Sequence, residues 1–438
     1  MAGRSSRRGS SRDAVSPLRV TLPNGLRAVA LGLPGVHRVA ILTVIRVGAR
    51  YETEESNGVS HLLEHMLYRG IPGYPTAHDQ ALAFETLGGT LVAATGSDTG
   101  TLGVSCPPES FDGTLELMAR VYRNPLLRGL EVEKRIIREE ILEDLDEDGT
   151  LVDDYDLLRS IAFEGHPLGY PVIGTVEHVD RFDVARLRRH HRKHYVGAGT
   201  VIAIVGPIAA DAALRGVEKH FGPISDGKEL RVEAPAPQQA PVFRYVDSAS
   251  SQTALRVGFR GGGSNDELEP ATELVLRLLD DGNSTRLYAR LCDERGLAYD
   301  VGAGYEASED AGVLHIGCGM AHAEAETVLG EILGVIRSLR DEGPTKAELD
   351  KAKARHRWGL DDMLDDPGEV ADFLADSSLR GGARTVEERR AQIDDVTPDA
   401  IRTAAERLFR AQNLSAVAVG IQTKRRQAKL ERLVRTFE

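Results

Sequence analysis

The order of sequence segments in the first half of the chain is repeated in the second half. The segment RVGAR at 46–50 corresponds to RVGFR at 256–260, and three further pairs of segments match in the same order. These pairs are 94–121 with 305–336, 131–148 with 347–366, and 195–206 with 409–420. Each match is weak alone, but four matches in an unchanged order are typical of an internal duplication. The repeat therefore predicts that the 438 residues fold as two related halves.

Residue patterns within the halves predict both strands and helices. Alternation over 18–30, interrupted by Pro23-Asn24-Gly25, predicts a β-hairpin, and 40–47 predicts a buried strand. Apolar residues at helical spacing predict helices over 58–68 and 130–147. We expect an α+β protein with two homologous domains, each an antiparallel sheet packed with helices.

A polar segment rich in proline divides the chain. Residues 226–241 contain the run APAPQQ, which favours an extended linker. We expect a disordered basic tail over 1–16, an N-terminal domain over 17–225, and a C-terminal domain over 242–438.

His61, Glu64 and His65 form the motif H-x-x-E-H within the helix predicted over 58–68. Residues four apart share one face of a helix, so both imidazoles can bind one metal ion, and Glu64 lies beside them. Imidazole suits Zn²⁺, which in catalytic sites takes three protein ligands and leaves one position for water. The alternative interpretation is a helix with two surface histidines and a solvated glutamate.

The duplication provides an internal control for the metal hypothesis. Pairing Val47 with Val257 gives an offset of 257 − 47 = 210, which places Ala271, Leu274 and Val275 opposite the three motif residues. The second half therefore lacks the motif, and its residues at these positions predict an apolar helix. A polar cluster retained in only one copy favours a function over a structural role.

A catalytic zinc site needs a third ligand, for which the acidic helix over 130–147 supplies candidates. Spacing does not choose among Glu133, Glu139, Glu140 and Glu143. Zinc lowers the pKa of bound water to near 7, and Glu64 is placed to accept its proton and pass it to a leaving amine. The expected chemistry is hydrolysis of an amide bond.

The motif followed by Glu133-Lys134-Arg135-Ile136-Ile137-Arg138-Glu139-Glu140 resembles the pitrilysin/insulinase family of peptidases, the inverzincins, which join H-x-x-E-H to a downstream pair of glutamates. This resemblance implies that one Zn²⁺ per chain is bound by His61, His65 and Glu140, with Glu64 as the base. It implies that Glu133 is the auxiliary acid that supports the site. The segments LPNGL at 22–26, HPLG at 166–169 and GLAY at 296–299 also look like family positions.

In its length, the chain resembles the short-chain branch of the family, which includes mitochondrial processing peptidase and its bacterial relatives. In that branch two chains enclose a chamber in which unfolded peptides are cut, and the substrate adds a strand near the zinc. The implied substrate-binding residues are Ala93, Ala94 and Thr95, together with Tyr299. Val92 departs from the asparagine that the family often has at that position.

A second departure concerns the partner subunit. Active relatives commonly have an arginine seven residues before the tyrosine of the GLAY element, but here that position is Cys292, and a thiol does not replace a guanidinium. Arg290 or Arg295 is a possible substitute. We expect a homodimer or a heterodimer, and Cys292 favours a heterodimer whose other subunit supplies an Arg/Tyr pair. The alternative functions are a non-catalytic assembly subunit of the same fold and a zinc-bearing subunit that is inactive alone.

Composition restricts the remaining classes of function. A net charge of −13 disfavours nucleic acid and anionic membranes as partners, and the expected ligands are peptides. No apolar run approaches the roughly 20 residues that span a bilayer, and the start of the chain lacks the pattern of a secretory signal. Three widely separated cysteines predict free thiols in a reducing compartment, the cytoplasm in preference to the mitochondrial matrix. The run RHHRKH at 189–194 predicts a solvated basic helix face.

Overall fold

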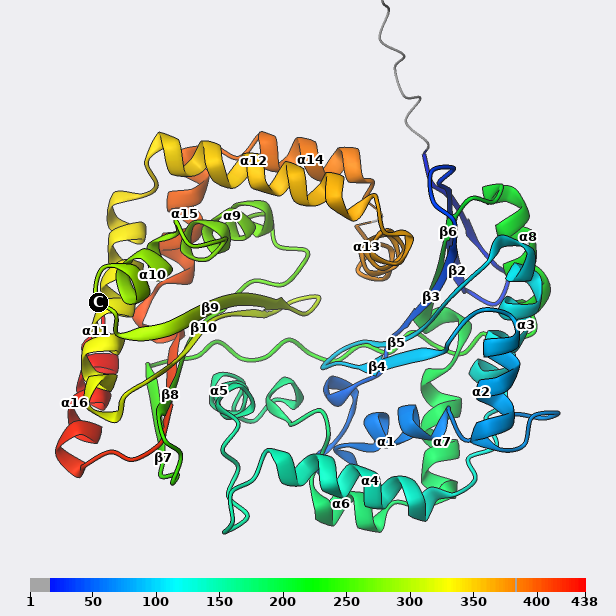
Figure 1. The fold of residues 1–438 in the computed structure, drawn as a ribbon, viewed down its shortest axis with the longest axis horizontal. Coiled ribbons are helices and arrows are strands. Elements are labelled where there is room, and N and C mark those ends of the chain that lie inside the picture. Colours follow the sequence, from blue (N-terminus) through cyan, green and yellow to red (C-terminus); the bar gives the residue numbers. More distant parts are fainter. Residues whose placement is uncertain (1–15, 383) are drawn as a thin grey trace, which may run out of the picture.

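Two β-sheets, each covered by helices, form the framework of the protein (Figure 1). The structure is a computed structural model that describes residues 16–382 and 384–438. The predicted disordered tail lies, apart from Ser16, outside the described residues. The predicted α+β class, with two related halves, is confirmed.

The first sheet contains six strands in the order β1-β2-β6-β3-β5-β4. Their bounds are β1 Leu18–Thr21, β2 Arg27–Gly32, β3 Val39–Ile45, β4 Val92–Thr95, β5 Gly100–Cys106 and β6 Thr200–Gly206. The predicted hairpin is present, because β1 and β2 pair antiparallel around Gly25, whose φ of 82° suits glycine. The pair β2 and β6 is parallel, a pairing that the alternating pattern did not predict.

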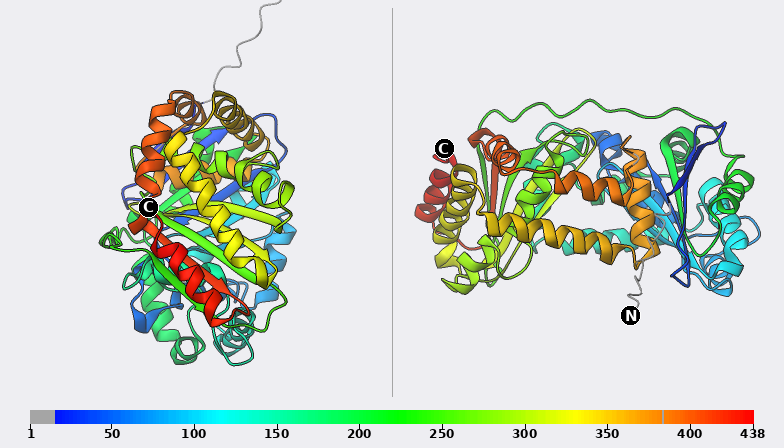
Figure 2. Two further views of the ribbon diagram at one scale, coloured as in Figure 1. Left: turned by 90° about the vertical axis from the view of Figure 1, so that its left-hand side faces the viewer. Right: turned by 90° about the horizontal axis from the view of Figure 1, so that it is seen from above.

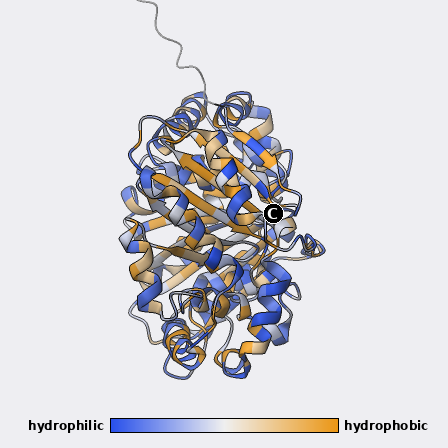
Figure 3. Ribbon diagram, turned by 90° about the vertical axis from the view of Figure 1, so that its right-hand side faces the viewer, coloured by the Kyte–Doolittle hydropathy of each residue, from blue (hydrophilic) through white to orange (hydrophobic). Residues whose placement is uncertain are grey.

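The second sheet repeats this arrangement with five strands in the order β7-β11-β8-β10-β9. Their bounds are β7 Val242–Val246, β8 Thr253–Gly261, β9 Ala298–Ala307, β10 Gly312–Met320 and β11 Leu414–Val419. The order β6-β3-β5-β4 in the first sheet corresponds to β11-β8-β10-β9 in the second, and β7 and β11 form the second parallel pair. The strands that cross the middle of the molecule are mostly hydrophobic, whereas the surrounding helices carry many hydrophilic residues (Figure 3).

The described part of the first half contains eight α-helices, most of which are amphipathic. They are α1 Val59–Met66, α2 Ala77–Thr86, α3 Phe111–Arg123, α4 Leu130–Glu143, α5 Asp154–Ala162, α6 Val176–Arg181, α7 Val184–His194 and α8 Ala210–Phe221. The second half contains α9 Glu269–Leu279, the short α10 Arg286–Tyr288, α11 Ala325–Glu342, α12 Lys346–Met363, α13 Pro367–Leu379, α14 Val386–Asp394, α15 Pro398–Leu408 and α16 Lys424–Arg435. None of the described helices is both long and apolar enough to cross a membrane.

The helix predicted over 130–147 ends earlier, at Glu143. The chain then reverses at Asp146, whose carboxylate accepts hydrogen bonds from the backbone N–H groups of Asp148 and Thr150. An aspartate that satisfies nearby backbone donors favours a turn over continued helix.

The prediction of a solvated basic face at 189–194 is wrong for its histidines. His191 and His194 are buried in α7, and each places a ring nitrogen within 2.9 Å of a backbone carbonyl oxygen, that of Tyr122 or Arg46. His190 lies 2.9 Å from the hydroxyl of Ser60 on α1. Imidazoles with such partners can be buried at low cost in free energy. Helix α7 therefore packs against α1.

The two halves exchange one helix each. Helix α5, from the first half, packs Leu157, Leu158 and Ile161 against the second sheet, where Val417 lies. Helix α13, from the second half, packs Val370, Ala371, Leu374 and Ala375 against β3 and β6 of the first sheet. Figure 1 shows both helices between the sheets. Each sheet therefore completes its core with a helix from the other half.

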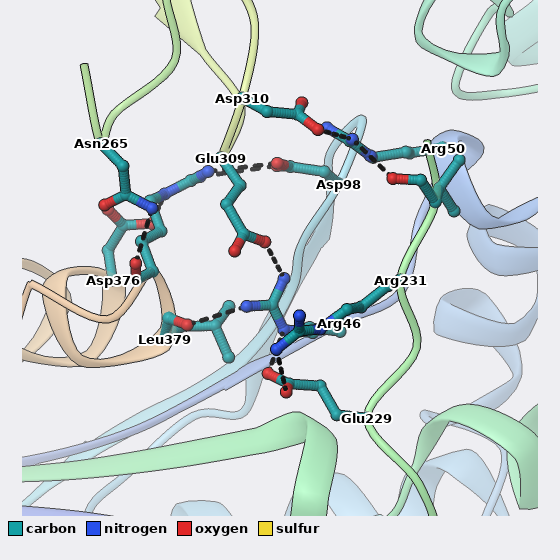
Figure 4. Close-up of polar contacts among 12 residues, drawn as sticks. Arg46, Arg50, Asp98, Glu229, Arg231, Asn265, Glu309, Asp310, Asp376 and Leu379 are labelled. Carbon is teal, nitrogen blue, oxygen red and sulfur yellow. Dashed lines mark hydrogen bonds and ion pairs between the residues drawn. The ribbon is translucent and has the colours of Figure 1, made fainter. Parts of the chain in front are cut away.

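Between α8 and β7 the chain runs as an extended segment along one side of the molecule (Figure 2). This segment contributes to a cluster of charges between the halves (Figure 4). Arg46, at the end of β3, lies 2.6 Å from Glu309 of the second half, 3.1 Å from Glu229, and 3.0 Å from the carbonyl oxygen of Leu379. The same cluster contains two more ion pairs between the halves, Arg50 with Asp310 at 2.6 Å and Arg380 with Asp98 at 3.1 Å.

Candidate metal centre

The start of α1 is fixed by a buried carboxylate. Glu52 accepts hydrogen bonds from the backbone N–H groups of Gly58 and Ser60, both at 2.8 Å. These are donors that an α-helix leaves free at its first turn, and a negative charge there also suits the helix dipole. Gly58 has φ of 90° and lies against Gly174, so a side chain would not fit at this position. The helix that carries the motif is thus anchored at its first residues.

His61, His65 and Glu140 converge where α1 meets α4. They form the one group of possible metal ligands found among the described residues, with ligand atoms all within 4.8 Å of one another. Each histidine places Nε2 at 3.6 Å from an oxygen of Glu140. Ligand atoms arranged tetrahedrally at about 2.1 Å from zinc lie about 3.4 Å apart. The three residues therefore fit a zinc ion with two imidazoles and one carboxylate.

The electrostatics of His61 also suit a metal ligand. Burial, together with the neighbouring His65, lowers the pKa of His61 to about 4. The imidazole is therefore neutral, as metal binding requires. Its Nδ1 is buried and has no hydrogen-bond partner among the described residues.

Glu133 supports His65 from the side opposite to Glu140. Its Oε2 lies 3.0 Å from His65 Nδ1, and its other oxygen forms an ion pair with Arg69. Burial alone would raise the pKa of Glu133, but His65 and Arg69 outweigh burial and lower it. A charged carboxylate on Nδ1 orients the ring so that Nε2 faces the metal position.

Glu64 lies beside this group without being part of it. Its Oε2 accepts a hydrogen bond of 2.7 Å from the hydroxyl of Thr95 on β4. Burial raises the pKa of Glu64, while Thr95 and His65 act in the opposite direction. A carboxylate that is held in place and is more basic than usual is suited to proton transfer.

The predicted substrate strand, β4, is the last strand of the first sheet. It pairs with β5 on one side only, and Val92 is 61 % exposed. The N–H of Ala93 donates to the hydroxyl of Tyr68 on the side away from β5. By the alternation of an antiparallel ladder, Ala93 and Thr95 turn their backbone groups to the same free edge, whereas those of Ala94 face β5.

The structure does not bring Tyr299 into this group. Tyr299 is 96 % exposed at the start of β9, in the other sheet, and no contact links it to the metal ligands within the described chain. Arg290 lies 2.6 Å from Glu331, and Arg295 pairs with the same carboxylate. Burial raises the pKa of Cys292, so its thiol is protonated and supplies no charge.

Sequence reasoning missed two residues of the site. Arg69 neutralises Glu133, and Tyr68 ties α1 to β4. Arg69 lies beyond the end of α1 at Met66, so helical spacing gives no signal for its contact with Glu133. The partner of Tyr68 lies 25 residues away, and no local pattern indicates such a contact.

The chain is similar to known families and proteins over most of its length. Residues 28–176 match the family described as "Insulinase (Peptidase family M16)", and residues 181–355 match "Peptidase M16 inactive domain". An uncharacterized zinc protease of Mycobacterium bovis is 30 % identical over 416 residues, which cover 92 % of this chain and 93 % of that protein. An uncharacterized zinc protease of Bacillus subtilis is 28 % identical over 395 residues, with coverages of 89 % and 95 %.

Solved structures share the fold. A protease from Helicobacter pylori matches with a TM-score of 0.87 and 21 % identity, covering 93 % of this chain and all of the other. A structure from Pseudomonas fluorescens, described as a peptidase M16 inactive domain, matches with a TM-score of 0.86 and 20 % identity, with coverages of 93 % and 98 %.

Proposed function

The chain belongs to the insulinase family of peptidases, peptidase family M16, and on that basis we propose that it is a zinc-dependent endopeptidase that cleaves unfolded peptides. The observation that carries the proposal is the convergence of His61, His65 and Glu140, with Glu64 adjacent but bound to Thr95 instead. Three ligands with a separate base are the set that a hydrolytic zinc site requires.

Each residue has a distinct role in the proposed reaction. His61, His65 and Glu140 would hold a zinc ion, which would supply a Lewis acid for the scissile carbonyl group and for water. Glu64 Oε1, the oxygen not bonded to Thr95, takes the proton of the attacking water and gives it to the leaving amine. Glu133 holds His65 in orientation through Nδ1. The proposal includes one zinc ion per chain, which is supported by the one ligand group found among the described residues.

The proposed substrate is an extended peptide that pairs with the free edge of β4. Backbone groups of Ala93 and Thr95 point to that edge and are suited to bind any extended chain, largely independent of its sequence. The N–H of Ala93 already donates a hydrogen bond to the hydroxyl of Tyr68. A substrate strand therefore either replaces this hydrogen bond or begins its pairing at Thr95.

The proposed assembly is a dimer that encloses the substrate in a chamber. Tyr299 is almost fully exposed and far along the chain from the zinc ligands, which supports a role toward a second subunit. Cys292 and the pairing of Arg290 and Arg295 with Glu331 leave no free guanidinium beside Tyr299 among these residues, which favours a heterodimer whose other subunit supplies an Arg/Tyr pair. We place the protein in the cytoplasm, since all three cysteines are free thiols.

The catalytic proposal is tested with Glu64→Gln, and Glu139→Gln on the exposed side of α4 is the matched control. Zinc is measured by elemental analysis, and activity by cleavage of an unstructured fluorogenic peptide in the presence of any co-purifying subunit. We expect about one zinc per chain in all three proteins, and a loss of about 10²-fold to 10⁴-fold in kcat for Glu64→Gln only. Unchanged turnover in Glu64→Gln would remove Glu64 from its role, and zinc-free wild-type protein would favour a non-catalytic subunit.

The assembly proposal is tested on the purified chain alone. Mass and cleavage activity are measured with and without candidate partner chains. We expect the isolated chain to cleave the peptide only slowly, and a partner chain with the Arg/Tyr pair to restore cleavage. Full activity of the isolated chain would contradict the heterodimer.

A further inference from the structure

The helix pair α9 and α12 is the counterpart of α1 and α4. Helix α1 follows β3 and α9 follows β8, the strands that occupy equivalent places in the two sheets. As predicted for the second half, Ala271, Leu274 and Val275 of α9 are buried in its core. The opposite side of α9 is not apolar, however, because it carries Glu273 and Arg277 toward α12.

These two residues and His356 form a polar cluster between α9 and α12, on the side of α9 opposite to the positions that correspond to the metal motif. Glu273 and Arg277 are four residues apart on α9, and His356 comes from α12. Arg277 lies 2.9 Å from Glu273, and His356 Nδ1 lies 3.4 Å from the same oxygen. The positive charge of Arg277 in this cluster opposes the binding of a metal ion.

A cavity opens at this position, between α9, α12 and α13. It has a volume of about 770 Å³, in the range of sites for small molecules. Apolar walls come from Leu360, Met363 and Phe373, and charged groups complete the lining. Its volume allows a ligand larger than a few water molecules.

His356 lines this cavity with an unused ring nitrogen. The residue is only 5 % exposed, and neither of its ring nitrogens has a hydrogen-bond partner among the described residues, with Nδ1 3.4 Å from an oxygen of Glu273. Glu273 faces the other nitrogen, Nδ1, which favours the tautomer with its proton there. Nε2 is then a buried acceptor that lacks a donor, and such groups are rare unless a ligand or water supplies one.

The uncompensated charge of the cavity is negative. Each of the four arginines in its lining is already in an ion pair: Arg277 with Glu273, Arg380 with Asp376, and Arg384 and Arg389 with Glu269. Glu369 and Asp372, on the face of α13 that turns away from the first sheet, have no such partner in the described chain. Partial desolvation and the neighbouring Asp376 raise the pKa of Asp372, while the charge of Arg380 acts in the opposite direction.

We propose that this cavity binds an organic cation, an alkylammonium or alkylguanidinium group. Its charged end lies between Asp372 and Glu369 and donates to Nε2 of His356, while its apolar stem lies against Leu360 and Phe373. The two carboxylates disfavour an anion, because the arginines of the lining are already paired. The cation is either a free small molecule or a basic side chain of a peptide, and the proposal is independent of the catalytic function.

The test measures binding to the full chain by calorimetry. Agmatine is the free probe, and an unstructured peptide with one arginine is compared with the same peptide carrying alanine. The variants Asp372→Asn and Glu369→Gln change exposed carboxylates, so they are expected to fold, and circular dichroism checks this. Asp365→Asn is the control, because Asp365 is exposed nearby but does not line the cavity.

We expect agmatine, the arginine peptide, or both to bind the wild-type chain, and the one that binds identifies the source of the cation. Each of the two cavity variants should weaken binding at least about tenfold, whereas Asp365→Asn should not change it. Absence of binding of both probes at about 10 mM would overturn the proposal, because a dissociation constant above that concentration is too weak for a specific site. An equal loss in all three variants would also overturn it, because it would indicate general attraction to an acidic surface.

Discussion

The hydroxyl of Thr95 donates to Oε2 of Glu64 at 2.7 Å. This bond links the last strand of the first sheet to the helix that carries the metal motif, so the substrate edge and the proposed base share one contact. It also makes the two oxygens of Glu64 inequivalent, because only Oε2 accepts this hydrogen bond.

Thr95→Val removes this donor while keeping the shape of the side chain. We expect kcat to fall about tenfold, as for loss of one hydrogen bond to a charged group, with zinc content unchanged. Thr95→Ser keeps the hydroxyl and should retain most of the activity. Equal losses in both variants would indicate that the methyl group, and not the bond, is what matters.

Glu133→Gln removes the charge that orients His65 and neutralises Arg69. We expect zinc affinity, measured by competition with a chelator, to fall about 10-fold to 100-fold. Glu131→Gln, two residues earlier and 76 % exposed in its side chain, should leave zinc affinity unchanged. An unaltered affinity in Glu133→Gln would mean that its contact with His65 is not required for metal binding.

Arg46→Met breaks the contacts of a buried guanidinium with Glu309, Glu229 and the carbonyl oxygen of Leu379. The free energy of unfolding should fall by about 2 kcal/mol, less than for a fully buried pair because both carboxylates reach solvent. Arg38→Met, which removes an exposed pair with Asp366, should cost less than about 1 kcal/mol. Urea denaturation measures both values, and similar values would contradict a special role for Arg46.

Leu374→Ala should lower the free energy of unfolding more than Arg46→Met does. Leu374 of α13 is only 1 % exposed and lies in the core that covers the first sheet. We expect a loss of about 2–5 kcal/mol in the free energy of unfolding. Trp358→Ala on α12 removes a larger side chain that is 64 % exposed and is expected to cost far less. The reverse order would show that α13 contributes little to the core of the first half.

The parts of the fold and site that the sequence predicted are those that depend on local spacing. Two histidines four apart necessarily share a helix face, and apolar periodicity located the main helices, including α1 and α4. Glu140 was implied only by the family resemblance, because spacing within α4 allows several glutamates to face α1.

The remaining features depend on contacts between distant segments. Periodicity shows that α5 and α13 each have an apolar face, but it does not show which sheet covers that face. The histidines of α7 were misjudged because their polarity is satisfied by Ser60 and by backbone carbonyl groups far away in the sequence. The apolar helix predicted in the second half was correct for its buried side only, and its other side carries Glu273 and Arg277.

The exchange of α5 and α13 has a consequence for the origin of the chain. A single half has a helix that leaves its own sheet and a sheet face that this helix does not cover. Two identical copies could satisfy both needs by giving each other that helix, as in a domain-swapped dimer. Joining two such copies in one chain would keep this exchange within a single molecule.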